Sequence, residues 1–202
     1  MPSRRLAIFA AVVLALAVSL GGTAYYYRAQ LPGPVSIGIA QVGGPFNLVN
    51  QDGKRVTEKD FRGTYMLVFF GYTYCPDVCP TTLQVMTAAL DAMGAKAASI
   101  QPIFVTIDPE RDTPEILKAY VGNFGSRLIG LTGGAEDIAA AARAYRVYYK
   151  KIDQPGGKDY LMDHSSIIYL MGPDGAFLKH FTYTTDAKQL AAGLAAAISG
   201  SS

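Results

Sequence analysis

Cysteine and histidine are scarce in this chain. Its 202 residues include two cysteines, Cys75 and Cys79, and two histidines, His164 and His180. A disulfide can therefore form only between the two cysteines, and a lipoprotein anchor on an N-terminal cysteine is excluded. A structural zinc site is disfavoured, because such sites use four Cys or His ligands at short spacings and these histidines are sixteen residues apart.

Charged residues are also few. Asp, Glu, Lys and Arg make up 17% of the chain, and the formal net charge is +2. No cluster of basic residues occurs, so the sequence gives no indication of nucleic-acid binding. No internal repeat is visible either, which argues against a repeat architecture.

The N-terminal segment lacks charge completely between residues 6 and 27. As a helix these 22 residues extend about 33 Å, enough to cross a hydrocarbon core about 30 Å thick. Arg4 and Arg5 precede the segment and favour a cytoplasmic N-terminus. The sequence thus predicts a single-pass anchor within residues 1–30, with the domain in the periplasm of a bacterial inner membrane. The alternative is a cleaved signal peptide, whose apolar segment is usually shorter. A mitochondrial transit peptide would be richer in Arg and Ser.

One domain is predicted after this anchor. Residues 31–41 are rich in proline and glycine and predict a short linker. Residues 42–199 have the usual size of a single domain with a core of its own. We therefore expect three parts: an anchor at 1–30, a linker at 31–41 and a domain at 42–199.

Strands and helices are expected to alternate along the domain. Residues 65–72 and 100–107 are continuous apolar segments, which is typical of strands buried on both faces. Asp52-Gly53 predicts the turn of an N-terminal hairpin between residues 46–49 and 55–57. Further strands are expected at residues 127–131, 147–152, 166–170 and 177–181, and helices around 83–93, 113–122, 138–145 and 190–198. This order predicts an α/β fold with a mixed sheet flanked by helices.

The two cysteines lie in G-Y-T-Y-C-P-D-V-C-P, residues 71–80, at the junction of a buried strand and the helix after it. Ligand sites in α/β sheets gather at the carboxyl ends of strands, and a helix N-terminus lowers the pKa of a thiol. This placement is that of thioredoxin, which has two rather than three residues between its cysteines. Residues four apart on a helix share one face, so both sulfurs can reach one small ion. They are also within disulfide range of each other.

His164 is the better candidate for a histidine ligand. It precedes a predicted strand and follows a polar loop, residues 153–160, whose composition predicts mobility. His180 lies inside a predicted strand and is interpreted as an ordinary strand residue. Two thiolates and one imidazole suit copper, and Cu(I) accepts low coordination. Spacing alone leaves three interpretations open: a copper site, a redox disulfide and an inert structural pair.

Several motifs together resemble the Sco/SenC family. They are the cysteine motif at 71–80, D-P-E-R-D-T-P at 108–114, D-H-S at 163–165, and Tyr169-Leu170 followed by P-D-G at 173–175. The similarity extends from about residue 46 to the final helix, and the combination of the first two motifs is highly specific. The sequence departs from the family pattern at Tyr72 and Tyr74, which are not ligand positions.

The resemblance implies a thioredoxin-like fold that binds one copper ion, Cu(I) or Cu(II), through Cys75, Cys79 and His164. It also implies a metallochaperone that assists assembly of the binuclear copper centre of cytochrome c oxidase. The expected partners are subunit II of that oxidase and copper-donor proteins. The alternative is a membrane-tethered thiol–disulfide oxidoreductase that reduces cysteines of this subunit or of other exported proteins. A redox or copper sensor is a third class. We expect an assembly factor rather than a turnover enzyme.

Two neighbouring features have both a functional and a structural interpretation. Asp77, between the cysteines, either tunes the thiolates or acts as a turn or cap residue. The 108–114 segment either supports the site or is a rigid loop in which Asp112 or Thr113 caps a helix.

Overall fold

The computed structural model describes residues 4–30, 42–154, 156 and 159–200. The chain forms two compact units, Met1–Ile39 and Ala40–Ser202. The predicted linker at 31–41 lies outside the described residues, as do parts of the polar loop expected at 153–160.

The first unit contains one helix, α1 (Arg4–Gln30), which covers the segment for which the sequence predicts a membrane anchor. Within the described residues, no helix combines the length and the apolar character that crossing a membrane requires. The predicted transmembrane helix is therefore not found in this structure.

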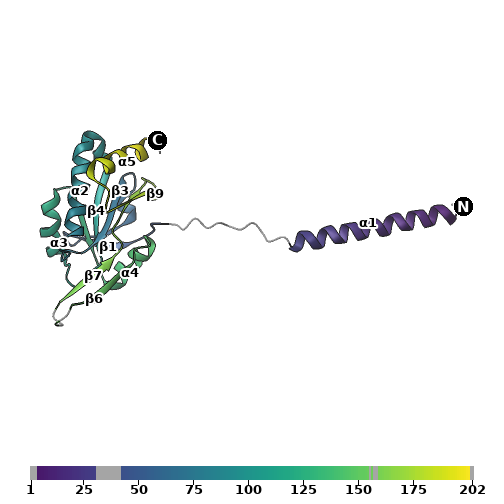
Figure 1. Cartoon of the computed structure of the whole chain (residues 1–202), viewed down its shortest axis with the longest axis horizontal. Helices are drawn as coiled ribbons and strands as arrows, with labels where there is room; N and C mark the ends of the chain where they lie inside the picture. Colours follow the sequence, from purple (N-terminus) through teal and green to yellow (C-terminus); the bar gives the residue numbers. More distant parts are fainter. Residues whose placement is uncertain (1–3, 31–41, 155, 157–158, 201–202) are drawn as a thin grey trace. The chain divides into compact units, whose positions relative to one another are not determined.

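The second unit is built on a seven-stranded mixed sheet with the order β2-β1-β5-β4-β3-β8-β9 (Figure 1). Strands β3, β4 and β5 are parallel, and the other pairings are antiparallel. The bounds are β1 Asn47–Asn50, β2 Arg55–Thr57, β3 Tyr65–Gly71, β4 Ile100–Thr106, β5 Ile129–Thr132, β8 Ile167–Met171 and β9 Phe177–Thr182. The predicted α/β fold with a mixed sheet and an N-terminal hairpin is confirmed.

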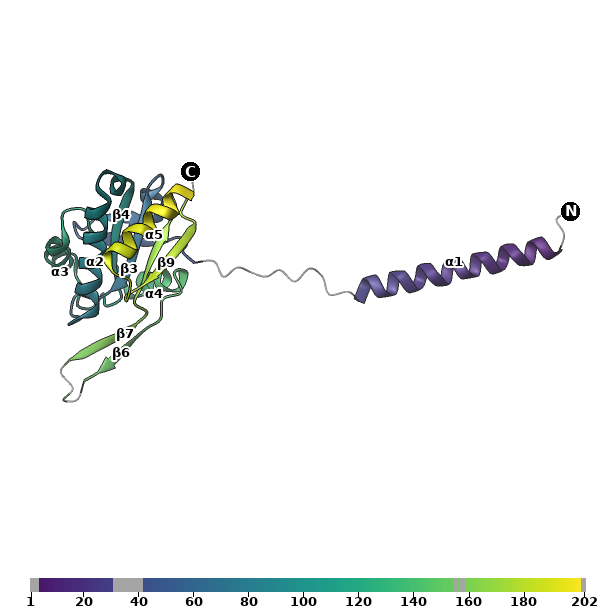
Figure 2. The same ribbon diagram turned by 45° about the horizontal axis from the view of Figure 1, so that its top comes forward.

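Helices cover both faces of this sheet. They are α2 (Val78–Met93), α3 (Pro114–Val121), α4 (Ala135–Ala144) and α5 (Ala187–Gly200), with 3₁₀ turns at Glu58–Phe61, Gly94–Ser99 and Gly122–Phe124. α2 and α5 pack side by side, as Figure 2 shows, and α3 packs against β5. Thr113 and Pro114 begin α3 as predicted, because the Thr113 hydroxyl accepts a hydrogen bond from the Ile116 amide.

The core is centred on β3, all seven residues of which are buried. Alternate side chains point to opposite faces of a strand. Phe69 meets Phe104 on one face, whereas Phe70 meets Tyr145 and Tyr169 on the other. A strand buried on both faces is held firmly in place, so its carboxyl end is a rigid support for the segment that follows.

The register of β3 and β4 positions the site. Gly71 at the end of β3 is opposite Thr106 at the end of β4. Because the two strands are parallel, the cysteine motif after β3 and the 108–114 segment after β4 leave the sheet at the same edge.

A separate two-stranded sheet projects from that region of the domain (Figures 1 and 2). It pairs β6 (Tyr149–Asp153) with β7 (Tyr160–His164) in antiparallel register. The sequence predicts β6 but not β7, and it places His164 at the boundary between a loop and the next strand. In the structure His164 is the last residue of β7 and is opposite Tyr149.

Candidate metal centre

The cysteine motif connects β3 to α2. Cys75 precedes the helix and Cys79 is its second residue, so the two do not share a single helical turn as the sequence suggests. The Cys79 amide donates to the Cys75 sulfur at 3.4 Å. Free amides at a helix N-terminus favour a negative charge, and the geometry therefore stabilises a thiolate at Cys75.

The two thiols differ in exposure and in proton affinity. Both are free; Cys79 is fully buried and Cys75 is half-buried. The hydrogen bond from the Cys79 thiol, partly opposed by burial, holds the pKa of Cys75 far below its usual range. The same hydrogen bond and burial raise the pKa of Cys79. The metal-free pair is thus one thiolate and one thiol, which is the arrangement of a nucleophile beside a proton donor.

His164 lies against this pair. Its Nε2 is 3.6 Å from the Cys79 sulfur. Its Nδ1 is 3.2 Å from the carbonyl oxygen of Ser165. A carbonyl can only accept, so Nδ1 carries a proton. In the neutral imidazole this leaves the Nε2 lone pair free toward the sulfurs. Edge contacts with Phe69 and Tyr72 support the ring.

The donor types and distances fit a soft metal ion. Sulfur and imidazole ligands at about 2.3 and 2.0 Å from a shared ion lie roughly 3.5–3.7 Å apart. The separation of 3.6 Å between Cys79 Sγ and His164 Nε2 matches this spacing. Across the residues that the structure describes, however, no group of three or more His, Cys, Asp or Glu side chains is already arranged to hold a metal. A bound ion would therefore need an adjustment of these side chains to gain three ligands.

Gly71 leaves room for the Cys79 thiol, a role that the residue pattern alone does not predict. A Cβ at position 71 would lie 2.7 Å from the Cys79 sulfur and 2.8 Å from Cε2 of Phe104. The sulfur therefore packs directly on the backbone of β3. The signal in the sequence is the glycine that ends an otherwise bulky apolar strand.

Asp112 links the cysteine motif to the end of β4 through hydrogen bonds. This fully buried carboxylate accepts hydrogen bonds from the Thr73 amide at 3.0 Å, the Thr73 hydroxyl at 2.6 Å and the Thr106 hydroxyl at 2.5 Å. Burial raises its pKa, and these hydrogen bonds oppose that effect. Of the two capping candidates, Thr113 caps α3, whereas Asp112 supports the site.

Asp77 acts on the site through its backbone, because a hydrogen bond from its amide helps to lower the pKa of Cys75. Asp77 occupies the N-cap position of α2 without a side-chain hydrogen bond to the helix amides. His180 lies in β9 and stacks on Phe177 with ring centroids 6.2 Å apart.

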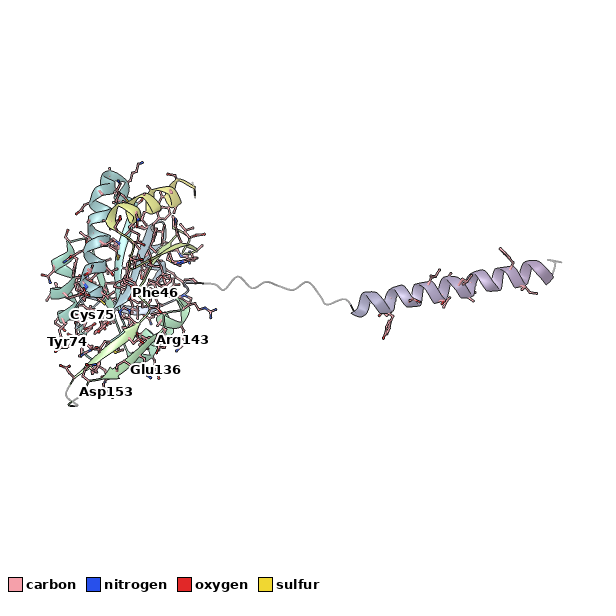
Figure 3. The ribbon with its side chains drawn as sticks, viewed as in Figure 1. Phe46, Tyr74, Cys75, Glu136, Arg143 and Asp153 are labelled. Atoms are coloured by element: carbon pink, nitrogen blue, oxygen red, sulfur yellow. The ribbon has the colours of Figure 1, made fainter. Side chains whose placement is uncertain are left out.

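In Figure 3 Cys75 and Tyr74 lie at the end of the domain from which the hairpin carrying Asp153 projects. The structure thus brings together Cys75, Cys79 and His164.

Comparison with known proteins gives a consistent assignment. The SCO1/SenC family model matches residues 36–199. The mitochondrial SCO1 homolog 1 protein of Arabidopsis thaliana is 44% identical over 160 residues, covering 79% of this chain and 48% of that protein. The mitochondrial SCO1 homolog of Homo sapiens is 44% identical over 161 residues, covering 79% of this chain and 54% of that protein. The chain therefore spans about half the length of these curated relatives.

Solved structures agree on the fold. A crystal structure of Arabidopsis thaliana ScoI with copper bound is 43% identical, with a TM-score of 0.75, covering 79% of this chain and 99% of that one. A structure of Bradyrhizobium japonicum ScoI with copper bound is 46% identical, with a TM-score of 0.71, covering 77% and 98%. The fold, the motifs and the extent of the match lead to one conclusion: this chain belongs to the SCO1/SenC family and has its thioredoxin-like fold.

Proposed function

We propose that this chain is a copper metallochaperone that assists assembly of the binuclear copper centre of cytochrome c oxidase. One observation carries the proposal: Nε2 of His164 lies 3.6 Å from the sulfur of Cys79, beside Cys75, whose pKa is lowered. Two sulfurs and one imidazole form the soft ligand set that copper prefers. The copper-bound ScoI structures at 43% and 46% identity support the same function.

Copper would be held as cargo by Cys75, Cys79 and His164, with one ion per chain. Thiolates suit Cu(I), and the imidazole also suits Cu(II), so the set accepts both oxidation states. Cys75 would bind first, because it is the more accessible of the two sulfurs and has the lower pKa. Cys79 must lose its proton to bind, so loading releases a proton. The bond from Nδ1 of His164 to the Ser165 carbonyl keeps Nε2 directed at the sulfurs.

A thiol–disulfide oxidoreductase is the second candidate, and the lowered pKa of Cys75 favours it. The Cys75 thiolate would attack a disulfide of the target and form a mixed disulfide, releasing one target thiolate. Cys79, after losing its proton, would then displace the second target thiolate. The target gains two electrons, and the Cys75–Cys79 pair is oxidised to a disulfide.

Oxidase assembly in cells distinguishes the two functions. Copper delivery requires His164, whereas thiol exchange requires only the cysteines. We expect cells whose only copy carries His164→Ala to lack the oxidase copper centre as fully as cells carrying Cys75→Ser, measured as oxidase activity at limiting copper. Full activity with His164→Ala and none with Cys75→Ser would identify the protein as a thiol reductant.

The location and partners are part of the proposal. We place the domain in the periplasm, tethered to a bacterial inner membrane by residues 6–27, because that segment contains no charge. Subunit II of the oxidase and a copper-donor protein are the proposed partners. Fractionated cells should retain the full chain in the membrane and release a chain lacking residues 1–30. Release of the full chain by a high-salt wash would rule out the tether.

A further inference from the structure

The hairpin that carries His164 is fastened to the domain by contacts around Arg111. Tyr160, the first residue of β7, donates its hydroxyl hydrogen to Asp108 Oδ1 at 2.7 Å. Arg111 Nη1 donates to the Tyr160 carbonyl at 3.0 Å, and the Tyr74 hydroxyl donates to Asp159 Oδ2 at 3.0 Å. We call Tyr74, Asp108, Arg111, Asp159 and Tyr160 the Arg111 clasp.

Arg111 touches all three segments of the site through its guanidinium. Its Nε forms an ion pair with Asp108 in its own segment. Its Cζ lies 4.7 Å from the ring centroid of Tyr74 in the cysteine motif and 3.6 Å from that of Tyr160 in the hairpin. Nη1 is also 3.5 Å from Asp159 Oδ1. The Arg111 side chain is 22% exposed, and cation–π contacts strengthen as water is excluded.

The hairpin depends on such contacts. A two-stranded hairpin is marginally stable by itself, and β6 and β7 do not pair with the main sheet. Most residues of β6 are exposed, and no residue of β7 is fully buried. A second contact between the hairpin and the domain is the ion pair of Lys151 with Glu110 at 3.1 Å, which is exposed and therefore weak. The contacts around Arg111 are more buried than this ion pair, and they add to the packing of Tyr149 and Met162 against the core.

The clasp acts on His164 through the length of β7. Tyr160 and His164 are the two ends of this strand, about 13 Å apart at roughly 3.3 Å per residue. Because β7 is paired with β6 along this length, a displacement at Tyr160 is transmitted to His164. We propose that Arg111 is a positioning residue: by holding Tyr160 and Tyr74 together it keeps Nε2 of His164 at the cysteine pair. This inference deepens the proposed function and rests on it where copper is concerned.

If Arg111 acted only through its positive charge, replacing it with lysine would have no effect. A positive charge near the motif would also favour the Cys75 thiolate, and lysine would supply it equally well. Lysine lacks the planar guanidinium of arginine. It therefore cannot donate to both Asp108 and the Tyr160 carbonyl while stacking on the Tyr160 ring. Arg111→Lys therefore separates positioning from charge.

The test compares the full chain with its Arg111→Lys and Tyr160→Phe variants, with Lys118→Ala as the matched control. Lys118 forms an exposed ion pair with Asp52 at 2.8 Å and has no contact with the clasp. Amide hydrogen exchange of β7 is measured without metal. Transfer of Cu(I) from the loaded protein to a chelator is measured separately. We expect Arg111→Lys to speed both β7 exchange and copper transfer about tenfold, as loss of a charged hydrogen bond does. Tyr160→Phe should have a smaller effect in the same direction, and Lys118→Ala none.

Each outcome decides the proposal. Faster amide exchange in β7 of Arg111→Lys, with unchanged exchange in β3 and β4, supports a role of Arg111 in positioning the hairpin. Equal loosening of β3, or exchange and copper transfer in Arg111→Lys at the rates of the unaltered protein, overturns it. If the unaltered protein binds no copper, the proposed function fails, while the exchange measured without metal still determines whether Arg111 holds the hairpin.

Discussion

Replacing His164 with alanine is expected to weaken copper binding on the order of 100-fold or more, since loss of even an indirect supporting residue costs 10–100-fold. Two sulfurs alone would then hold the ion. Cys75→Ser and Cys79→Ser should weaken binding at least as much, because each removes a thiolate. Competition titration of Cu(I) against a chelator of known affinity measures the effect.

The matched control for His164 is His180→Ala. His180 lies in β9 and stacks on Phe177, away from the cysteine motif, so its loss should leave copper affinity unchanged. His164→Ala should also retain formation of the Cys75–Cys79 disulfide, which does not use the imidazole. Unchanged copper affinity in His164→Ala would contradict the ligand assignment.

Gly71→Ala is expected to damage both the fold and the site. The added Cβ would lie 2.7 Å from the Cys79 sulfur and 2.8 Å from the Phe104 ring, in a strand that is buried throughout. Overpacking of this kind costs about 1–3 kcal/mol in the free energy of unfolding. Because relief of the clash displaces the Cys79 sulfur, copper affinity should fall as well. Urea unfolding and copper titration of the same variant measure the two effects.

Gly122→Ala is the control for this substitution. Gly122 follows α3 with right-handed helical backbone angles, and a Cβ there would meet no atom within 4 Å. We expect its stability and its copper affinity to stay close to those of the unaltered protein. A Gly71→Ala variant with the stability and affinity of Gly122→Ala would show that Cys79 does not need the close approach to β3.

The main features of the fold could be predicted from local patterns. The apolar segments at 65–72 and 100–107 predicted β3 and β4, and Thr113-Pro114 predicted the start of α3. The strand β7 was missed because its exposed Asp163 and the preceding polar, glycine-containing segment are typical of a loop. Pairing with β6, which a single sequence does not reveal, makes it a strand.

The candidate site was predicted in part. Cys75 and Cys79 are close in the sequence, and His164 was found because only two histidines exist. Its place beside Cys79 depends on a contact between residues 85 positions apart. The bonds from Thr73 to Asp112 and from Arg111 to Tyr160 span 39 and 49 positions. Such contacts depend on the register of β3 with β4 and on the path of the hairpin, so residue patterns alone did not assign their partners.

Copper stoichiometry of the protein in its two redox states tests the central claim most directly. Copper ligands must be thiolates, and a Cys75–Cys79 disulfide removes both of them. We predict one copper ion per chain for the reduced protein and no tight copper binding for the oxidised protein, measured by metal analysis after desalting. Equal copper uptake by the reduced and oxidised forms would contradict a site built on Cys75, Cys79 and His164.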